Sequence, residues 1–428
     1  MNKKIQKVLS VILSIFFFTG ASWQKKVNSV SKLWWLTTLA VVPAVGIPVA
    51  CWLSKKNDEN NSLNLVSNLD PFTNGSLAWS PFSFKAALVM AANGTSNEEA
   101  RKNVAKYVGF ESLEDANSWL ENIMDTQPKD IDIANSMWIV KEYSNNINKN
   151  FKNSIIKKFK ANCENVDIKD GDKVINNWVS EKTRGKISNI VEKLDGEDIL
   201  VLVNTIYFNS KFVKEFKDTG SIQFNGVNKT IEDVPTIKDE DNRWCDYCET
   251  NYYQAVKIPF KNECNLYMVL PKKNELFDKV KDIDVNQLAK NMQNERVIIE
   301  IPRFKIESSL SLKDYCNNNE LLKTFINSIF DKIHPEAIIS EIRQKVFWET
   351  KPKGVEAAAV TMIRIPKAAC PCLEKLKPDI KIIFDHAFIG FITDKDNNIL
   401  FKVNVKDIDS IENAKDSEGE YRRAIVKT

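Results

Sequence analysis

The sequence predicts an α+β domain in which helices pack on a large mixed central β-sheet. Apolar residues recur at helical spacing in the first half, as in residues 83–92 and 98–108, whereas runs rich in β-branched and aromatic residues dominate the second half. Helices followed by strands, without regular alternation, argue against a doubly wound fold. With 428 residues, 43% of them hydrophobic, the chain can bury a sizeable core.

The predicted strands share a bias toward β-branched and aromatic side chains. They cover residues 199–208, 255–259, 266–270, 297–306, 338–350, 381–393 and 398–405. The last two flank a turn at residues 394–397 and so predict a C-terminal hairpin. A further helix is expected after residue 167, through Trp178 and Val179.

Residues 1–60 are predicted to target and anchor the chain rather than to belong to the fold. The uncharged run 8–24 follows three lysines and has the pattern of a signal peptide. The uncharged run 33–54 is long enough to cross a bilayer. Three arrangements remain open: a signal peptide followed by an anchor, a two-span hairpin, or an anchor that ends in a lipid-modified Cys51. The domain is therefore expected to be membrane-anchored or secreted and extracytoplasmic.

The remainder is predicted to be one monomeric domain at 61–410 with a polar C-terminal tail at 411–428. The net charge is only +3 and the charges are interleaved, which excludes wholesale nucleic-acid binding. His334 and His386 are the only histidines, and the chain has no nucleophile-elbow, metalloprotease, dinucleotide-binding or P-loop motif. We therefore expect no enzyme activity and no cofactor, and interpret His386 as a structural residue.

The eight cysteines predict no disulfide framework. Cys245 and Cys248 form a CxxC pair, and Cys370 and Cys372 form a CxC pair. Together they offer the four thiolates of a tetrahedral zinc site, but the pairs are far apart in the sequence and neither has a zinc-ribbon context. Free thiols or a redox-sensitive loop are favoured over zinc, and the role of these cysteines remains open.

The segment after Gly354 has a period of two, typical of a strand with one buried face. Its charged residues, Glu356 and Arg364, fall on the opposite face from the small and apolar ones. The positions of the apolar face are Val355, Ala357, Ala359, Thr361, Ile363 and Ile365. One interpretation is a loop that can become a central strand. An ordinary strand or a helix start fits the pattern equally well, because three consecutive alanines also suit a helix.

A series of short motifs then decides between these interpretations. They are Ser80-Pro81-Phe82-Ser83, Asn177-Trp178-Val179, Thr183-Arg184-Gly185-Lys186-Ile187, LVNTIYF at 202–208, Ile258-Pro259-Phe260 with MVLP at 268–271, IPRFK at 301–305, Gly354-Val355-Glu356-Ala357-Ala358-Ala359, His386-Ala387-Phe388 and ILF at 399–401. In this order they resemble the motifs of the serpins, the serine-protease-inhibitor superfamily, over roughly residues 63–407. Each motif is weak alone, and their collinear order makes the resemblance specific.

The resemblance implies a serpin-like fold with further sheets and an exposed reactive-centre loop. Its implied partner is a target protease, of the serine or the cysteine class. That protease cleaves the loop and forms an acyl-enzyme, after which the loop inserts as a strand into the central sheet. The alternative is a non-inhibitory serpin-like binding or chaperone module at a membrane.

Residue by residue, the resemblance assigns the loop hinge to Gly354, Val355, Glu356, Ala357, Ala358 and Ala359. It assigns the region where the sheet opens to Ser80, Ser83, Asn204, Gln344 and Phe212. For the reactive bond, the position before the cut is assigned equally to Ala368, which Ala369 follows, and to Lys367, with Arg364 as the next candidate.

Four positions depart from the family pattern. Val355 stands where inhibitors often have Thr or Ser, and Pro352 replaces an acidic residue. Gln344 stands where a His is common, and Phe212 where a Trp often packs. Because a Pro stiffens the pivot and an apolar hinge residue can slow insertion, these departures put the efficiency of inhibition in question more than the fold.

Overall fold

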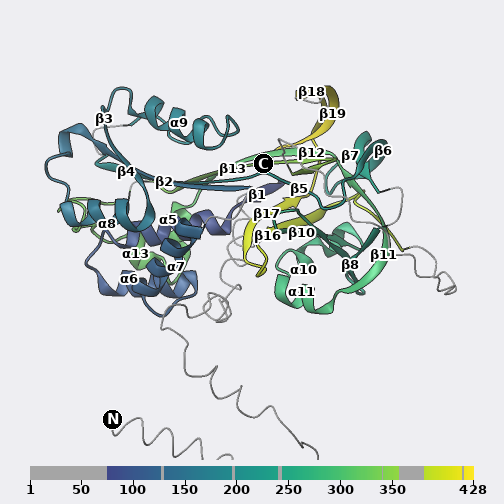
Figure 1. Ribbon diagram of the computed structural model, residues 1–428, viewed down its shortest axis with the longest axis horizontal. Coiled ribbons are helices and arrows are strands. Elements are labelled where there is room, and N and C mark those ends of the chain that lie inside the picture. The colour runs from purple at the N-terminus through teal and green to yellow at the C-terminus, as the bar shows by residue number, and fades with distance from the viewer. Residues whose placement is uncertain are drawn as a thin grey trace, which may run out of the picture. The chain divides into compact units, whose positions relative to one another are not determined.

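The computed structural model of the chain describes residues 75–126, 130–194, 198–239, 243–339, 341–355, 380–416 and 419–428 (Figure 1). The predicted targeting and anchor segment, residues 1–60, lies outside this set. Within the described ranges, no helix is both long and apolar enough to cross a bilayer.

Helices cover both faces of the main sheet, most of them on one side (Figure 1). The helices on that side include α5 (Pro81–Ala92), α6 (Glu98–Val108), α7 (Leu113–Thr126), α8 (Lys149–Phe159) and α13 (Lys323–Ile326). Helix α9 (Gly171–Lys182) lies on the other side. The short helices are η1 (Lys141–Tyr143), η2 (Asn274–Leu276), α10 (Phe277–Val280), α11 (Val285–Asn291) and α12 (Lys313–Asn318).

The main sheet consists of two groups of strands. The first group, in the order β3-β2-β4, comprises β3 (Asn162–Val166), β2 (Ile131–Val140) and β4 (Leu200–Phe208). The second group, in the order β18-β19-β12-β13-β14-β5, comprises β18 (Ser410–Asp416), β19 (Gly419–Val426), β12 (Phe304–Ser311), β13 (Arg343–Lys351), β14 (Gly354–Val355) and β5 (Ser210–Lys211). Strand β5 begins one residue after β4 ends, so the two groups adjoin where the chain passes from β4 to β5.

A second, ten-stranded sheet packs beside the main one. Its strands are β1 (Leu77–Trp79), β17 (Ile399–Val405), β16 (Phe388–Thr393), β10 (Asn265–Pro271), β9 (Tyr253–Pro259), β8 (Arg243–Glu249), β11 (Gln293–Pro302), β7 (Thr230–Lys238) and β6 (Lys217–Asn225), in this order, with β15 (Ile380–Ile383) on β11. The predicted C-terminal hairpin corresponds to β16 and β17, which pair antiparallel.

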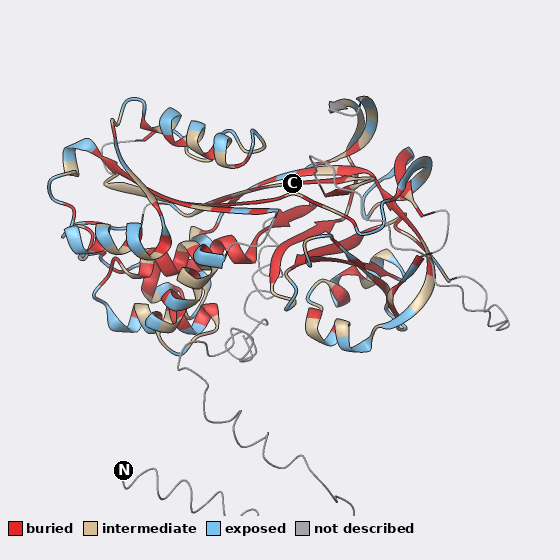
Figure 2. Ribbon diagram, viewed as in Figure 1, coloured by how far each residue is buried: buried red, intermediate tan, exposed pale blue. Residues whose placement is uncertain are grey.

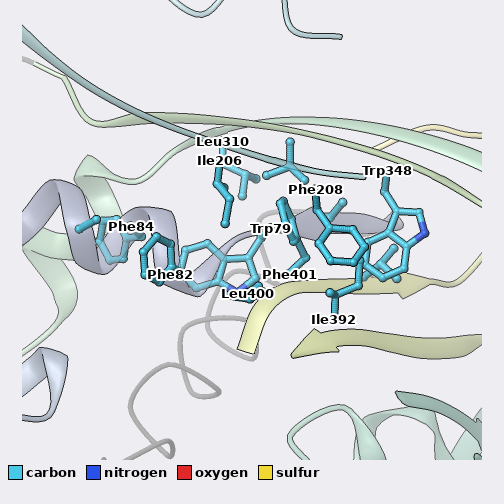
Figure 3. Packing of buried hydrophobic residues seen from close by; sticks show 14 of the residues in the cluster. Trp79, Phe82, Phe84, Ile206, Phe208, Leu310, Trp348, Ile392, Leu400 and Phe401 are labelled. Carbon is cyan, nitrogen blue, oxygen red and sulfur yellow. The ribbon is translucent and has the colours of Figure 1, made fainter. Parts of the chain in front are cut away.

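The main hydrophobic core lies between the main sheet, the second sheet and α5 (Figures 2 and 3). Trp79 from β1 and Phe82 from α5 contribute to it from below the main sheet, and Trp348 contributes from β13. Helix α5 is buried along most of its length because it runs through this core. It begins at Ser80, whose hydroxyl accepts a hydrogen bond from the backbone N–H of Ser83 (3.1 Å), and Pro81 supplies a favourable first residue.

The α+β prediction is confirmed, and two strand predictions need correction. The predicted strand 297–306 is two strands, β11 and β12, which belong to different sheets. Arg303 lies at the crossing, because its N–H donates to Pro235 and its carbonyl accepts from Ala424 (both 2.7 Å). The predicted strand 381–393 likewise divides into β15 and β16.

The predicted polar tail at 411–428 differs most from the structure. These residues form the β18–β19 hairpin, and β19 pairs in parallel with β12, aligning Phe304 with Ala424 and Ile306 with Val426. Ala424 and Val426 are buried, at 0% and 2% exposure. The side-chain alternation of a strand allows these two residues to enter the core while their neighbours remain polar.

Candidate functional site: the slot between β4 and β13

A slot separates β4 from β13 in the middle of the main sheet. Both strands have nine residues, and each has a long partner on one side only, β2 for β4 and β12 for β13. Within the described part of the chain, β4 and β13 are not hydrogen-bonded to each other. A cavity of about 410 Å³ lies between them, lined by both strands and by α5. The backbone edges that face this cavity are those to which an added strand can bind.

The floor of the slot is fixed by Gln344 and Ser80. The Gln344 side chain accepts a hydrogen bond from Ser80 N–H through Oε1 (3.0 Å) and donates one to the Ser80 carbonyl through Nε2 (2.9 Å). The Ser80 hydroxyl donates to the Leu400 carbonyl (2.7 Å). Ser83 also lines the cavity. An amide that both donates and accepts thus joins β13 to the start of α5.

Asn204 lies across the slot, on the same face of the sheet as Gln344. Its Nδ2 donates to Oδ1 of Asn135 in β2 (2.8 Å), and Asn135 in turn donates to the Phe159 carbonyl (2.9 Å). The Oδ1 of Asn204 is buried and accepts no hydrogen bond from any residue that the structure describes. Because a buried acceptor without a donor is costly, the slot presents a polar atom suited to an incoming hydroxyl or amide.

Gly354 and Val355, the first two residues of the predicted hinge, lie at one end of the slot. Gly354 pairs with Lys351 of β13 and Lys211 of β5, and Val355 pairs with Thr350 and Ser210, antiparallel on both sides. Strand β14 is therefore a short strand between β13 and β5, at the end of the slot where β4 is followed by β5. A Cβ on Gly354 would clash with the Ser210 carbonyl and lie 2.8 Å from Cα of Lys211, so this close approach requires glycine.

The chain just before the hinge is held by backbone hydrogen bonds from residues 212–216. Phe212 N–H donates to the Lys353 carbonyl (2.9 Å), and Phe216 N–H donates to the Pro352 carbonyl (2.8 Å). Phe212 is fully buried and stacks on Phe260, with ring centroids 5.0 Å apart. Phe212 thus contacts the chain just before the predicted hinge, and Pro352 takes part through its carbonyl, which needs no N–H.

A buried ion pair supports the same segment. Nε of Arg243 donates to Asp239 (2.5 Å), and each side chain is only 4% exposed. The Arg243 guanidinium also lies 3.9 Å from the centroid of the Phe216 ring and donates to the Lys214 carbonyl (2.9 Å). Because the pair is buried, removing one partner would leave an uncompensated charge near the predicted hinge.

The outer side of the slot is crossed by the segment that follows α9. Lys186 lies 4.9 Å above the Phe347 ring of β13, and Glu192 forms an ion pair with Arg343 at the lower end of β13 (2.5 Å). Both contacts join the α9 segment to the β13 side of the gap. Because the side chains involved are partly or largely exposed, each contact stabilises the packing of the α9 segment on β13 only weakly.

Of the two cysteine pairs considered as metal ligands, only Cys245 and Cys248 lie among the described residues. Among the described residues, no cluster of three or more His, Cys, Asp or Glu side chains could hold a metal ion. Burial raises the pKa of Cys245 to about 12 and that of Cys248 to about 11, which keeps both thiols protonated at neutral pH. Cys370 and Cys372 lie outside the described residues.

His386 has structural contacts on both ring nitrogens. Nδ1 is 2.7 Å from Asp385 and Nε2 is 2.6 Å from the Pro271 carbonyl. Burial lowers the pKa of His386, but the hydrogen bonds to Asp385 and Pro271 outweigh it and hold the pKa above its ordinary value. The protonated ring can donate to both oxygens at once, which explains the direction of the shift.

A profile of the family described as Serpin (serine protease inhibitor) matches residues 57–407. The chain is a serpin. Membership in this family makes it a relative of protease inhibitors and not an enzyme. The predicted resemblance is thereby confirmed.

Individual relatives agree with this assignment. The chain is 28% identical over 354 residues to an uncharacterized serpin-like protein of Thermococcus kodakarensis, covering 77% of this chain and 80% of that one. It is 29% identical over 356 residues to leukocyte elastase inhibitor A of Rattus norvegicus, covering 76% and 92%. Among solved structures, it is similar in fold to cleaved Serpin 42Da (TM-score 0.72, 21% identity, 84% and 100% coverage) and to Arabidopsis AtSerpin1 in its native stressed conformation (TM-score 0.70, 19% identity, 85% and 99% coverage).

The structure places Ser80, Ser83, Asn204 and Gln344 around the slot and Phe212 beside the predicted hinge. The hinge residues Glu356, Ala357, Ala358 and Ala359 and the reactive-bond candidates Arg364, Lys367, Ala368 and Ala369 lie outside the described residues. Their roles stay predictions.

Sequence reasoning missed the contact between the C-terminal hairpin and β13. Tyr421 and Arg423 of β19 both bind the carboxylate of Glu349. The sequence offered a signal for this strand. After a turn that contains a Gly, two sets of residues alternate, which is typical of a strand. One set is Tyr421 and Arg423, and the other is Arg422, Ala424 and Val426.

Proposed function

We propose that this serpin inhibits a protease by presenting its loop as a substrate and then inserting the cleaved loop as a strand into the β4–β13 slot. The observation that carries the proposal is β14. Gly354 and Val355 have already begun the missing strand, paired on both sides, directly above the cavity. The rest of the inserted strand has to continue the same pairing along β13 and along β5 and β4.

The two observed pairs set the register of that continuation. Because pairing is antiparallel on both sides, each further loop residue meets the next lower residue of β13 and of the β4–β5 segment. The residues of the predicted inward face would then lie on the core side of the sheet, as Val355 does. Their neighbours would be Trp348 and Phe208 for Ala357, Val346 and Ile206 for Ala359, Gln344 and Asn204 for Thr361, and Ile342 and Leu202 for Ile363.

In this register, each inward-facing loop residue matches its neighbours on β13 and β4 in size and polarity. The alanines meet the bulky residues at the top of the slot, where a larger side chain would overpack the core. Thr361, the polar residue of the inward face, meets the polar level formed by Gln344 and Asn204. Its hydroxyl could donate to the Asn204 Oδ1, which lacks a donor among the described residues. A register shifted by one residue would instead direct Glu356 and Arg364 into the core.

The departures from the family pattern are compatible with insertion. Val355 is only 4% exposed in β14, so the apolar side chain is already accommodated at the hinge. Pro352 lies in the turn before β14, where its carbonyl accepts the Phe216 N–H (2.8 Å). Neither Val355 nor Pro352 therefore prevents the start of loop insertion at β14.

The proposal is tested by incubating the protein with a panel of trypsin-like, elastase-like and cysteine proteases. We expect a complex that survives denaturing electrophoresis with at least one of them. Ala368 suits an elastase-like pocket, in keeping with the similarity to leukocyte elastase inhibitors, whereas Lys367 and Arg364 suit an acidic trypsin-like pocket. The mass of the released peptide identifies the bond.

A pair of matched variants separates insertion from mere cleavage. Ala359→Arg places a charge on the inward face and should convert the protein into a substrate that is cleaved without forming a complex. Ala358→Arg carries the same charge on the outward face and should still form the complex. Equal behaviour of the two variants would contradict the proposed register.

A non-inhibitory binding or chaperone role is the second candidate, favoured by Val355 and Pro352 at the hinge. It predicts clean cleavage across the whole panel, no stable complex, and no gain in thermal stability after cleavage. The two candidates therefore give opposite results in the same experiment.

Attachment to a membrane through residues 1–60 is also part of the proposal. Its support is the uncharged run 33–54. Flotation of the full-length protein with lipid vesicles tests it, with a chain starting at residue 61 as the control. Recovery of both proteins in the vesicle-free fraction would contradict anchoring.

A further inference from the structure

Trp244, the second residue of β8, is 69% exposed. The other tryptophans that the structure describes are buried or half-buried; they are Trp79, Trp119, Trp138, Trp178 and Trp348. A large aromatic ring gains free energy from burial, and tryptophan is among the residues most enriched at the energetic centres of protein interfaces. Trp244 is therefore a candidate contact for a partner protein.

Strand β8 holds the Trp244 ring on the solvent-exposed face of the second sheet. Successive side chains of a strand point to opposite faces, and the flanking Arg243 and Cys245 are each 4% exposed. The buried ion pair of Arg243 with Asp239 (2.5 Å) fixes the start of the strand, and Trp244 itself pairs with Arg296 of β11. Because an ordered strand presents the ring, less conformational freedom is lost on binding than from a mobile segment.

The residue next to Trp244 contacts the chain that leads to β14. The Arg243 guanidinium lies 3.9 Å from the centroid of the Phe216 ring and donates to the Lys214 carbonyl (2.9 Å). Phe216 N–H in turn donates to the Pro352 carbonyl (2.8 Å), two residues before β14 begins. The start of β8 and the last described residues before 356 are thus joined by a short series of contacts.

The described chain resumes at Ile380, two strands away from Trp244. Val297 of β11 pairs with Arg243 of β8 and also with Ile380 of β15, so β8 and β15 lie on opposite edges of β11. Figure 1 shows β8 beside β11. Neighbouring strands are about 4.8 Å apart, which places the start of β15 about 10 Å from the start of β8. Residues 356–379 are therefore attached to the described fold at two points close to Trp244.

We propose that Trp244 binds the target protease directly, outside the loop, on the protease surface beside its substrate cleft. This inference rests on the proposed function, because it concerns the protease that attacks the loop. Such a protease has to approach this end of the domain, since the segment that it takes as a substrate begins and ends here. An indole ring offers an apolar surface and one N–H donor, so it fits an apolar patch that contains a hydrogen-bond acceptor.

The test measures the second-order rate constant for complex formation with the protease of the panel that the protein inhibits fastest. Trp244→Ala should lower this constant about tenfold, the size of loss typical of an aromatic residue at the centre of an interface. The number of protein molecules consumed for each protease inhibited should not change, because the contact acts before cleavage.

Tyr252→Ala is the matched control. Tyr252 is also aromatic and 51% exposed, and it lies in the turn after β8, roughly 25 Å from Trp244 along the strand. The rate constant of this variant should equal that of the unmodified protein. Both side chains are largely exposed, so both variants should keep the melting temperature of the unmodified protein.

A second measurement reports the contact without cleavage. The same protease with alanine in place of its catalytic nucleophile still binds the loop but forms no acyl-enzyme. Its affinity should fall about tenfold for Trp244→Ala and stay unchanged for Tyr252→Ala. Equal affinities of the unmodified protein and Trp244→Ala would contradict the proposed contact.

The outcomes separate this inference from the function on which it rests. No stable complex with any protease of the panel would overturn both. A complex that forms at the same rate in Trp244→Ala, or equal losses in Trp244→Ala and Tyr252→Ala, would overturn only the role of Trp244. Sedimentation that shows a dimer of the unmodified protein and a monomer of Trp244→Ala would assign the surface to a second copy of the chain and would also overturn it.

Discussion

Gln344 offers a sharp test of the slot as the structure describes it. Its side chain is 6% exposed and joins β13 to α5 through two hydrogen bonds to the backbone of Ser80. Gln344→Leu has a similar volume and removes both bonds. The Ser80 N–H would lose its partner, whereas the Ser80 carbonyl would keep the Phe84 N–H as a donor (3.2 Å).

The expected cost follows from this asymmetry. A buried donor left without an acceptor costs about 1–3 kcal/mol, and loss of the second bond adds about 1 kcal/mol. We therefore expect the free energy of unfolding to fall by about 2–4 kcal/mol. For a domain of about 350 residues, with an unfolding entropy near 2.1 cal/mol/K per residue, this corresponds to a drop in melting temperature of roughly 3–5 °C.

The assay is thermal unfolding of the uncleaved protein, monitored by circular dichroism or calorimetry. Gln293→Leu makes the same chemical change at an exposed position of β11 and serves as the control. If Gln344→Leu melts within a degree of Gln293→Leu, the Gln344–Ser80 link does not support the slot and the reasoning fails.

Three further predictions concern the surroundings of the slot. Gly354→Val should expel β14 from the sheet and speed hydrogen exchange at residues 350–355, whereas Gly75→Ala, where a Cβ meets only ordinary contacts, should not; unchanged exchange in Gly354→Val would contradict the observed pairing. Asp239→Asn should lower the free energy of unfolding by about 3 kcal/mol, because Arg243 remains buried without its counter-charge, and a change below about 1 kcal/mol in denaturant titrations would argue against this support. The stabilisation from protonated His386 should be fully present below about pH 6.5 and be lost as the pH rises through its raised folded-state pKa, so the difference in stability from His386→Asn should shrink from pH 6 to pH 8, and a difference that grows with pH would show the opposite shift.

The sequence was sufficient to predict the α+β architecture, whereas the sheet-opening role assigned to the residues around the slot stays a prediction. The period-two pattern after Gly354 is interpreted as a loop hinge only together with the motifs that form β4, β11 and β17, and this interpretation stays a prediction. The hydrogen bonds of Gln344 are consistent with the expected contact near Ser80. The reactive bond stays a prediction, because Lys367 and Ala368 lie outside the described residues.

Other features depend on three-dimensional contacts that a local pattern does not reveal. Arg303 lies within one apolar run, and only the partners of its backbone, in β7 and β19, divide that run into two strands. The residues after 410 are polar on average, and their strand character depends on the burial of Ala424 and Val426 beside β12. The pairing of Glu349 with Arg423 joins positions 74 residues apart, so sequence alone gives no reason to connect them.

The central claim, that the loop enters the β4–β13 slot, is tested most directly by the thermal stability of the protein before and after cleavage of the loop. Insertion would bury the remaining inward residues, chiefly Ile363 and Ile365 with smaller contributions from the alanines and Thr361. At about 1.5–3 kcal/mol for each large aliphatic side chain, the gain is roughly 5–10 kcal/mol, or on the order of 10 °C in melting temperature. A rise of that order in the cleaved protein is the predicted result. A cleaved protein that melts at or below the temperature of the intact one would contradict the account.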